Sequence, residues 1–218
     1  MTLLRQRCDT LAGERLHSFR RAEHLMGMPA VRSSGRQWTL EEFYRERDAA
    51  PPGERWEYVD GEVLVTPAPN WVHQRAITRL YDALAPYVRQ HALGDLFPVS
   101  PDVRLDPRLV LQPDLLLVPP GHLRKRSDFV HRLVLAVEVL SPGSARHDRV
   151  KKRPAYQRNR VADYWIVDER SQTIERWRPD DERPEILSER LVWHPEGASE
   201  PLLLDLSAYF AQVTPEED

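Results

Sequence analysis

The sequence has almost no cysteine and no long apolar run, and each shortage excludes a class of protein. Cys8 is the only cysteine in 218 residues, so an internal disulfide and a zinc site built on cysteines are both excluded. No apolar stretch approaches the roughly 18 residues that a membrane-spanning helix needs. The first seven residues are not followed by the apolar segment of a signal peptide. We therefore expect a cytoplasmic protein without a membrane-spanning segment.

Lysine is also scarce. Only three of the 31 basic residues are lysines, at positions 125, 151 and 152, and the other 28 are arginines. Lysine can be tuned to lose its proton, whereas arginine cannot, so the adjacent pair Lys151 and Lys152 hints at a site that requires an amine. Genomic base composition is the alternative explanation of this bias. Because the net charge is −3, binding to nucleic acid would need a local basic patch.

Several catalytic patterns are missing from the chain. There is no G-x-x-x-x-G-K-[ST] segment, so the chain carries no nucleotide-hydrolysing motor of that type. There is no G-x-S-x-G elbow of a serine hydrolase. The eight histidines show no H-E-x-x-H spacing, which argues against a zinc hydrolase.

The chain divides into an extension, one domain and a tail. Residues 1–36 are polar and rich in arginine, and we expect a flexible extension there. Residues 37–213 have the length and composition of a single domain. Residues 214–218 form an acidic tail. Thr39 and Glu42 predict a capping box at the first helix of the domain, with Trp38 and Phe43 packed together across the helix start.

The expected elements alternate between helices and strands. Asp60-Gly61 between two strand-like segments predicts a hairpin. We expect Pro86 to kink the long second helix and Gly94 to end it. Helices are expected over 39–48, 71–91, 147–159 and the end of 202–210, and strands over 55–59, 62–66, 96–99, 102–105, 114–118, 133–140, 163–167, 173–177 and within 184–193. This order predicts an α/β fold with a mixed sheet covered by helices.

Glu138 is the most informative residue. It lies inside an almost wholly apolar segment, residues 133–140, which has the composition of a strand buried on both faces. An unpaired carboxylate there would cost several kcal/mol or remain protonated. The alternative to a functional role is an ion pair with an arginine or a strand end that reaches water.

Asp114 favours the functional interpretation. It follows Pro113 and opens a second apolar strand. A Pro-Asp pair alone is usually part of a turn. If the two strands are neighbours, both carboxylates face one cavity, and Mg²⁺ takes oxygen ligands of this kind. The carbonyl of Val139 would supply a third oxygen.

The third feature is the helix expected after the turn that follows Glu138. Lys152 and Tyr156 stand four residues apart, on one face of that helix. Residues 146–160 contain seven basic residues and one acid, Asp148. A charge run is usually a solvated face. Because this one follows the carboxylate strand, we expect Arg146, Arg149 and Arg153 to hold a phosphate backbone there.

These motifs together resemble the Uma-two family, the putative restriction endonuclease domain of the PD-(D/E)XK nuclease superfamily. The resemblance covers residues 38–210. It is carried by an ordered series of segments, which are Trp56–Glu62, Pro67–His73, Pro113-Asp114, Glu138–Pro142, Asp148, Lys152–Tyr156 and Asp163–Asp168. It implies a restriction-endonuclease-like core, in which a mixed sheet is flanked by helices.

The resemblance also implies roles for individual residues. Asp114 and Glu138 would be the metal carboxylates and Lys152 the catalytic lysine. The usual lysine position, two residues after the glutamate, holds Leu140 here, so the lysine comes from the following helix. Glu57 would be an accessory acid pointing into the site, and His73 would line the same cleft. The alternative for Glu57 is that it is an ordinary acid of a hairpin, and the alternative for His73 is that it is an ordinary residue of the first helical turn.

The predicted function is Mg²⁺-dependent cleavage of DNA, with Mn²⁺ as a substitute. Bound Mg²⁺ would activate water and neutralise charge at phosphorus, and Lys152 would orient or deprotonate that water. One rival is a non-catalytic nucleic-acid-binding or regulatory module of the same fold; another is a nuclease acting on RNA or on nucleotides. Because two active sites suit the cutting of both strands of DNA, a homodimer is favoured, although the sequence does not indicate an interface. We expect the Tyr164-Trp165 pair to belong to the core.

Overall fold

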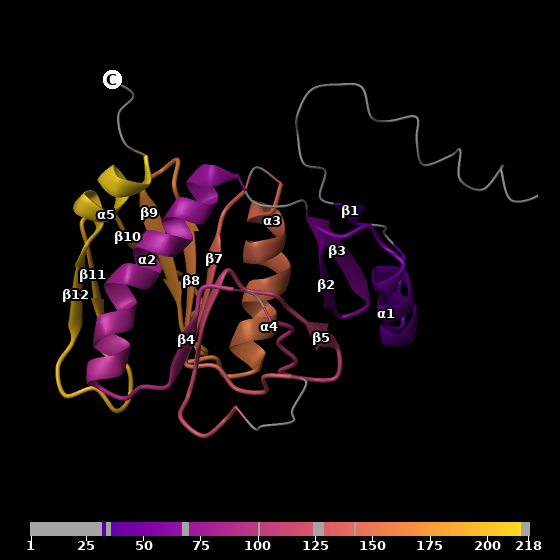
Figure 1. Cartoon of the computed structure of the whole chain (residues 1–218), viewed down its shortest axis with the longest axis horizontal. Coiled ribbons are helices and arrows are strands. Elements are labelled where there is room, and N and C mark those ends of the chain that lie inside the picture. The colour runs from indigo at the N-terminus through magenta and orange to yellow at the C-terminus, as the bar shows by residue number, and fades with distance from the viewer. Residues whose placement is uncertain are drawn as a thin grey trace, which may run out of the picture.

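A six-stranded mixed sheet forms the centre of the computed structural model (Figure 1). The structure describes residues 32–33, 36–66, 70–99, 101–123, 129–141 and 143–214. Expectations for the rest of the N-terminal extension, for the loop at 67–69 and for the tail beyond Thr214 lie outside these residues. The strand order is β10 (Glu185–Leu187), β9 (Thr173–Trp177), β8 (Asp163–Asp168), β7 (Leu135–Val139), β6 (Leu115–Val118) and β4 (Asp95–Phe97).

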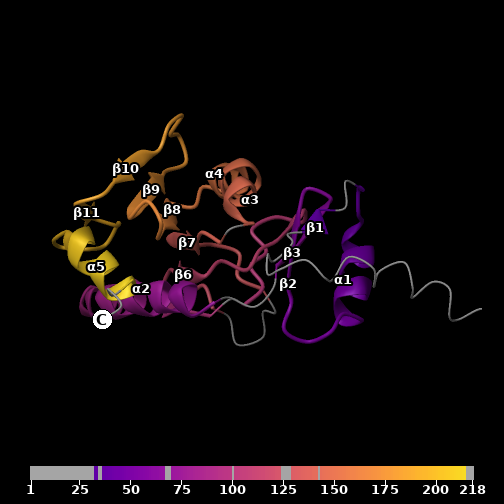
Figure 2. The same cartoon turned by 90° about the horizontal axis from the view of Figure 1, so that it is seen from above.

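The central strand β7 is buried on both faces, which explains its apolar composition. It pairs with β6 in antiparallel and with β8 in parallel orientation. One face of the sheet is covered by α2 (Trp71–Gln90) and α5 (Leu206–Val213). The other face carries a continuous helical segment (Figure 2). That segment consists of α3 (Ala145–His147), the π-helical turn η1 (Asp148–Lys152) and α4 (Arg153–Arg158).

A second, smaller sheet lies beside the central one, with α1 (Leu40–Asp48) on its outer side (Figure 1). Its order is β1 (Arg32–Ser33), β3 (Glu62–Thr66), β2 (Arg55–Val59) and β5 (Leu109–Val110). The turn between β2 and β3 has positive φ at both Asp60 and Gly61, as a tight two-residue hairpin turn requires. The predicted hairpin is therefore confirmed.

A third sheet of two strands, β11 (Arg190–Trp193) and β12 (Leu202–Asp205), packs near α5. Trp193 of β11 is almost fully buried and makes ring contacts with Tyr87 and Trp165. Trp165 and its neighbour Tyr164 are also buried, which confirms their placement in the core. In the described part of the chain, no helix combines the length and the apolar character that crossing a membrane requires.

Most of the elements expected from the sequence are present. The capping box of α1 is formed, and Phe43 is fully buried beside the partly buried Trp38. The strand expected over 102–105 is wrong, because only Val103 makes isolated bridges, to Leu111 and Val130. The short strand β5 was not expected. The helix expected over 147–159 is interrupted by the π-helical turn η1.

The end of α2 also differs from expectation. The helix continues through Pro86 and stops at Gln90, where Ala92 takes the left-handed conformation and the amide of Leu93 bonds to the carbonyl of Val88. This arrangement closes the helix without glycine. Gly94 has a different role: its φ is +128°, and a Cβ there would lie 1.9 Å from the carbonyl oxygen of Val118.

Candidate active site

Asp114 and Glu138 come together because β6 and β7 are neighbours. Leu115 pairs with Val137 in antiparallel register, and the amide of Asp114 donates to the carbonyl of Val137 at 2.9 Å. The Oδ2 atom of Asp114 then accepts a hydrogen bond from the amide of Val139 at 2.8 Å. Asp114 is thus fixed against the segment that carries Glu138, as the proposed pairing of the strands requires.

Glu138 faces the helical segment on its side of the sheet. In β7 the side chains alternate, so Val137 and Val139 join the core under α2 whereas Ala136 and Glu138 face the opposite way. The Oε1 atom of Glu138 lies 3.1 Å from Nζ of Lys152. The hydroxyl of Tyr156 donates to the same oxygen at 3.2 Å. Both partners that the sequence placed on one helix face therefore meet the strand carboxylate.

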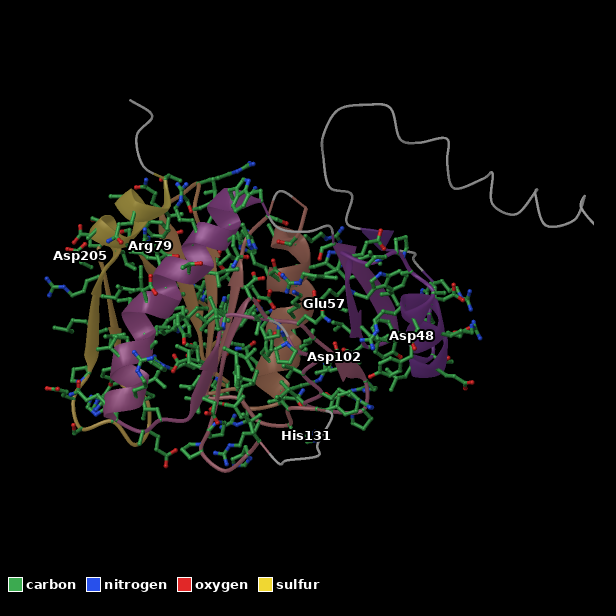
Figure 3. All side chains as sticks on the ribbon, viewed as in Figure 1. Asp48, Glu57, Arg79, Asp102, His131 and Asp205 are labelled. Carbon is green, nitrogen blue, oxygen red and sulfur yellow. The ribbon has the colours of Figure 1, made fainter. Side chains whose placement is uncertain are left out.

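Glu57 reaches the same ammonium group from the smaller sheet. Its Oε2 atom lies 2.7 Å from Nζ of Lys152, and its Oε1 atom accepts from the amide of Gln112 at 2.8 Å. Glu57 is only 1% exposed. Figure 3 shows it between the strands of the smaller sheet and the helical segment. Two sheets therefore contribute to one site, and the accessory position implied for Glu57 is occupied by a buried carboxylate.

The π-helical turn adds a fourth carboxylate. Asp148 opens η1 and Lys152 ends it, and the Oδ1 atom of Asp148 lies 3.3 Å from Nζ of Lys152. In an α-helix, each step of four residues moves a side chain about 40° around the axis, so the two steps from Asp148 to Tyr156 would separate their directions by about 80°. A π-turn, with about 4.4 residues per turn, drifts the other way. The combination places Asp148, Lys152 and Tyr156 on one face.

His73 and Arg55 are bound to Asp114. The Nε2 atom of His73 lies 3.2 Å from Oδ2 of Asp114 and 3.0 Å from the carbonyl oxygen of Val139. Both neighbours are acceptors, so Nε2 carries the proton. Arg55 donates to Oδ1 of Asp114 and to the carbonyl of Gln112. His73 therefore lies beside Asp114 and Val139, and Arg55 is an additional cation there.

The carboxylates of this site are electrostatically different. Burial alone would raise the pKa of Asp114, but the hydrogen bond from His73 and the charge of Arg55 hold that pKa well below its usual range. Burial raises the pKa of Glu138 well above its usual range, and Lys152 only partly opposes this. Burial would lower the pKa of Lys152, yet the surrounding carboxylates raise it. Asp114 is thus ionised and Lys152 charged at neutral pH.

Two of the three arginines predicted to hold phosphate have other partners. Arg149 pairs with Glu175, and the guanidinium of Arg153 bonds to Gln157 and lies over the ring of Trp177. For Arg146 the structure gives no ion pair among the described residues. Lys151, the neighbour of Lys152, points to Glu62 at 2.6 Å. Only Lys152 of the two lysines enters the carboxylate cluster.

The buried carboxylates of the site suit a divalent cation. Four buried carboxylates face two cationic side chains, Lys152 and Arg55. If all four carboxylates were ionised, their charge would exceed that of the two cations by two, which one divalent ion would balance. No three acidic, histidine or cysteine side chains of the described part are arranged as a ready cage. Two carboxylates, the Val139 carbonyl and water fit the habit of Mg²⁺.

A model of a known protein family matches residues 40–208, and its description is "Putative restriction endonuclease". The chain belongs to this family, Uma2. Membership confirms the resemblance drawn from the motifs and supports a nuclease-like function. None of the curated proteins matches the chain.

The fold of this Uma2 protein is also found in a solved structure. A crystal structure described as "a putative nuclease belonging to DUF820" from Anabaena variabilis is 21% identical in sequence and superposes with a TM-score of 0.67. The match covers 81% of this chain and 99% of the other. At this identity the likeness establishes the fold, which confirms the predicted mixed α/β architecture.

Two residues of the site had no role in the sequence-based prediction. Asp148 belongs to the motif series and stands four residues before Lys152, so helical spacing alone could have placed it beside the lysine. Arg55 is one of 28 arginines, and its only signal is its position two residues before Glu57 on the same strand face. Its contact with Asp114 depends on how the two sheets meet.

Proposed function

We propose that this Uma2 protein is a divalent-metal-dependent endonuclease that hydrolyses phosphodiester bonds of DNA. The observation that supports the proposal most directly is that Asp114 is bound to the amide of Val139, next to Glu138, and that Glu138 in turn lies 3.1 Å from the Lys152 ammonium group, all three side chains being buried. Mg²⁺, with Mn²⁺ as a substitute, is the proposed metal. A non-catalytic module would have no need to keep this costly set of buried charges.

Asp114 and Glu138 would hold the metal together with the Val139 carbonyl. When bound, the metal would acidify a water molecule and neutralise charge that develops at phosphorus. His73 and the Val139 amide keep Asp114 oriented and ionised. Lys152 would orient the attacking water and pair with a phosphate oxygen through its ammonium group. Glu57 would act through the lysine or through a water molecule.

The proposal is tested with DNA cleavage by the full chain in Mg²⁺ and in Mn²⁺. Plasmid and linear DNA, RNA and free nucleotides are offered in parallel, because RNA cleavage is the rival activity. The variants Asp114→Asn and Lys152→Gln should each lose at least ~100-fold in rate. The matched control is Lys151→Gln, which removes a neighbouring lysine that points to Glu62 and should retain most activity.

Three other results would contradict the proposal in different ways. If the folded protein leaves DNA intact in both metals and also shows no Mn²⁺ binding by calorimetry, it is not a metal-dependent nuclease. Mn²⁺ binding without any cleavage would favour the non-catalytic module. Cleavage of RNA alone would move the activity to the other nucleic acid.

A further inference from the structure

Asp148 is a buried carboxylate for which the proposed reaction has no role so far. Its side chain is 1% exposed, and burial raises its pKa although the charge of Lys152 and a hydrogen bond with Ser144 oppose this. The nearest charged group is Nζ of Lys152, at 3.3 Å. Burying a charged carboxylate costs stability even where a cation and a hydroxyl group lie beside it. A residue that served the fold alone would be better replaced by an uncharged one.

We propose that Asp148 is a positioning residue, which keeps the Lys152 ammonium group in place when a metal ion occupies the site. The inference rests on the proposed function. Lys152 has three carboxylate neighbours in the structure, Glu57, Glu138 and Asp148. Glu138 would serve the metal, and Glu57 would be shared with water. Asp148 would then be the one of these three carboxylates whose sole partner in the reaction is the Lys152 ammonium group.

The backbone of Asp148 is well suited to this role because it is fixed on both sides. Its amide donates to the carbonyl of Ser144 at 3.0 Å. Its own carbonyl accepts from the amide of Arg153 and from the hydroxyl of Tyr164, the latter at 3.2 Å. The π-turn therefore has anchored ends, with the acid at its start and the lysine at its end.

The origin of the other two acids supports the same conclusion. Glu57 belongs to the smaller sheet, so its distance to Lys152 depends on how the two sheets are placed. Glu138 lies on β7, across the interface with the helix. Asp148 shares one helical segment with Lys152, so the contact between them is independent of movements between sheets.

The principal test is Asp148→Asn in the full chain, because asparagine keeps the shape and removes the charge. We expect kcat for DNA to fall ~10- to 100-fold with little change in KM, as for a misplaced catalytic group. The unfolding temperature should change little, because the loss of the ion pair with Lys152 is offset by the loss of a costly buried charge. Mn²⁺ affinity should be retained, in contrast to Asp114→Asn. Asp148→Glu, which restores the charge, should recover part of the lost rate.

A second measurement does not depend on cleavage. The chain contains only three lysines, so the side-chain ammonium signals in a ¹⁵N NMR spectrum can be assigned with single substitutions. In saturating Mg²⁺ we expect the Lys152 ammonium protons of the wild type to exchange slowly with water. In Asp148→Asn they should exchange fast enough for the signal to broaden or vanish, while the Lys151 signal stays unchanged.

Three outcomes would overturn the inference. These are an unchanged kcat in Asp148→Asn, a loss of Mn²⁺ affinity that would make Asp148 a metal ligand, and a fall in unfolding temperature that would make it structural. A double-mutant cycle completes the test: in the Lys152→Gln background, Asp148→Asn should have almost no further effect. Absence of cleavage by the wild type would refute the proposed function instead, and the NMR comparison would still decide the role of Asp148.

Discussion

At the scale of single residues, buried carboxylates lie at both ends of the parallel strand pair β7–β8. Four carboxylates surround Lys152 and Arg55 at the end of the pair that carries Val139; these are Glu57, Asp114, Glu138 and Asp148. Asp163 lies at the other end, opposite Leu135, where its Oδ2 atom accepts from the indole of Trp193 at 3.1 Å and its Oδ1 atom has no hydrogen-bond donor among the described residues. Burial raises the pKa of Asp163, and the Trp193 bond and Arg178 only partly oppose this.

The raised pKa of Asp163 predicts a pH dependence of stability. As the pH falls through the folded-state pKa, the folded protein takes up a proton that the unfolded chain does not yet hold, so Asp163 contributes stability towards acidic pH. Asp163→Asn keeps the acceptor for Trp193 and removes the titration. The variant should therefore gain in stability relative to the wild type at about pH 7.5, and this advantage should shrink as the pH falls.

Urea denaturation of both proteins at several pH values measures this difference. The control is Asp180→Asn, which removes an exposed carboxylate paired with Arg160 and should leave the pH profile of stability unchanged. A stability difference between Asp163→Asn and the wild type that stays constant across this range would contradict the assigned pKa direction.

At the scale of elements, the junction between α2 and β4 depends on a glycine. Gly94 has φ +128°, and an added Cβ would lie 1.9 Å from the carbonyl oxygen of Val118. Gly94→Ala should therefore destabilise the protein by ~3 kcal/mol or more, because strain and a backbone clash act together. Gly53→Ala is the matched control, since Gly53 also has positive φ but nothing within 4 Å of the added Cβ; it should cost ~1 kcal/mol. Equal costs in denaturant titrations would mean that the clash at Val118 is relieved without penalty.

The elements that could be predicted from sequence are those with local signals. The capping box at Thr39 and the Asp60-Gly61 turn are defined by residues adjacent in the chain, and they were predicted correctly. The strand β5 has two residues and exists through pairing with Tyr58 and Val59, about 50 residues away. No local pattern could indicate it. The π-turn η1 has a local signal that the expected regular helix left out, because Pro154 has no amide hydrogen to donate to the carbonyl of Val150.

The candidate site also contains residues that the sequence could indicate and contacts that it could not. Glu138 was noticeable because a carboxylate in an apolar strand demands a partner, and Asp114 because it opens the next apolar strand. Their side-by-side placement follows from strand pairing. The partners of Arg149 and Arg153 lie in β9 and in α4. A basic run in a sequence does not reveal which of its charges are already paired.

At the scale of the whole molecule, the site joins two sheets. Glu57 comes from the smaller sheet, and Asp114, Glu138 and Lys152 belong to the larger unit. Outside the site, Arg158 binds Asp60 through both terminal nitrogens, at 2.8 and 2.9 Å. These contacts fix the smaller sheet against the helical segment. A ligand that draws the carboxylates together should therefore stabilise both sheets at once.

This coupling predicts that a divalent metal raises the stability of the entire chain in one transition. At a free concentration 100 times its dissociation constant, Mn²⁺ should add ~2.7 kcal/mol to the free energy of unfolding. The physical reason is that the ion neutralises a cluster with more carboxylates than cations and binds the folded state alone. Tryptophan fluorescence during urea unfolding, with and without a chelator, measures the change. Asp114→Asn should abolish the response while Lys151→Gln keeps it; equal responses in the wild type and Asp114→Asn would place the bound metal elsewhere on the surface.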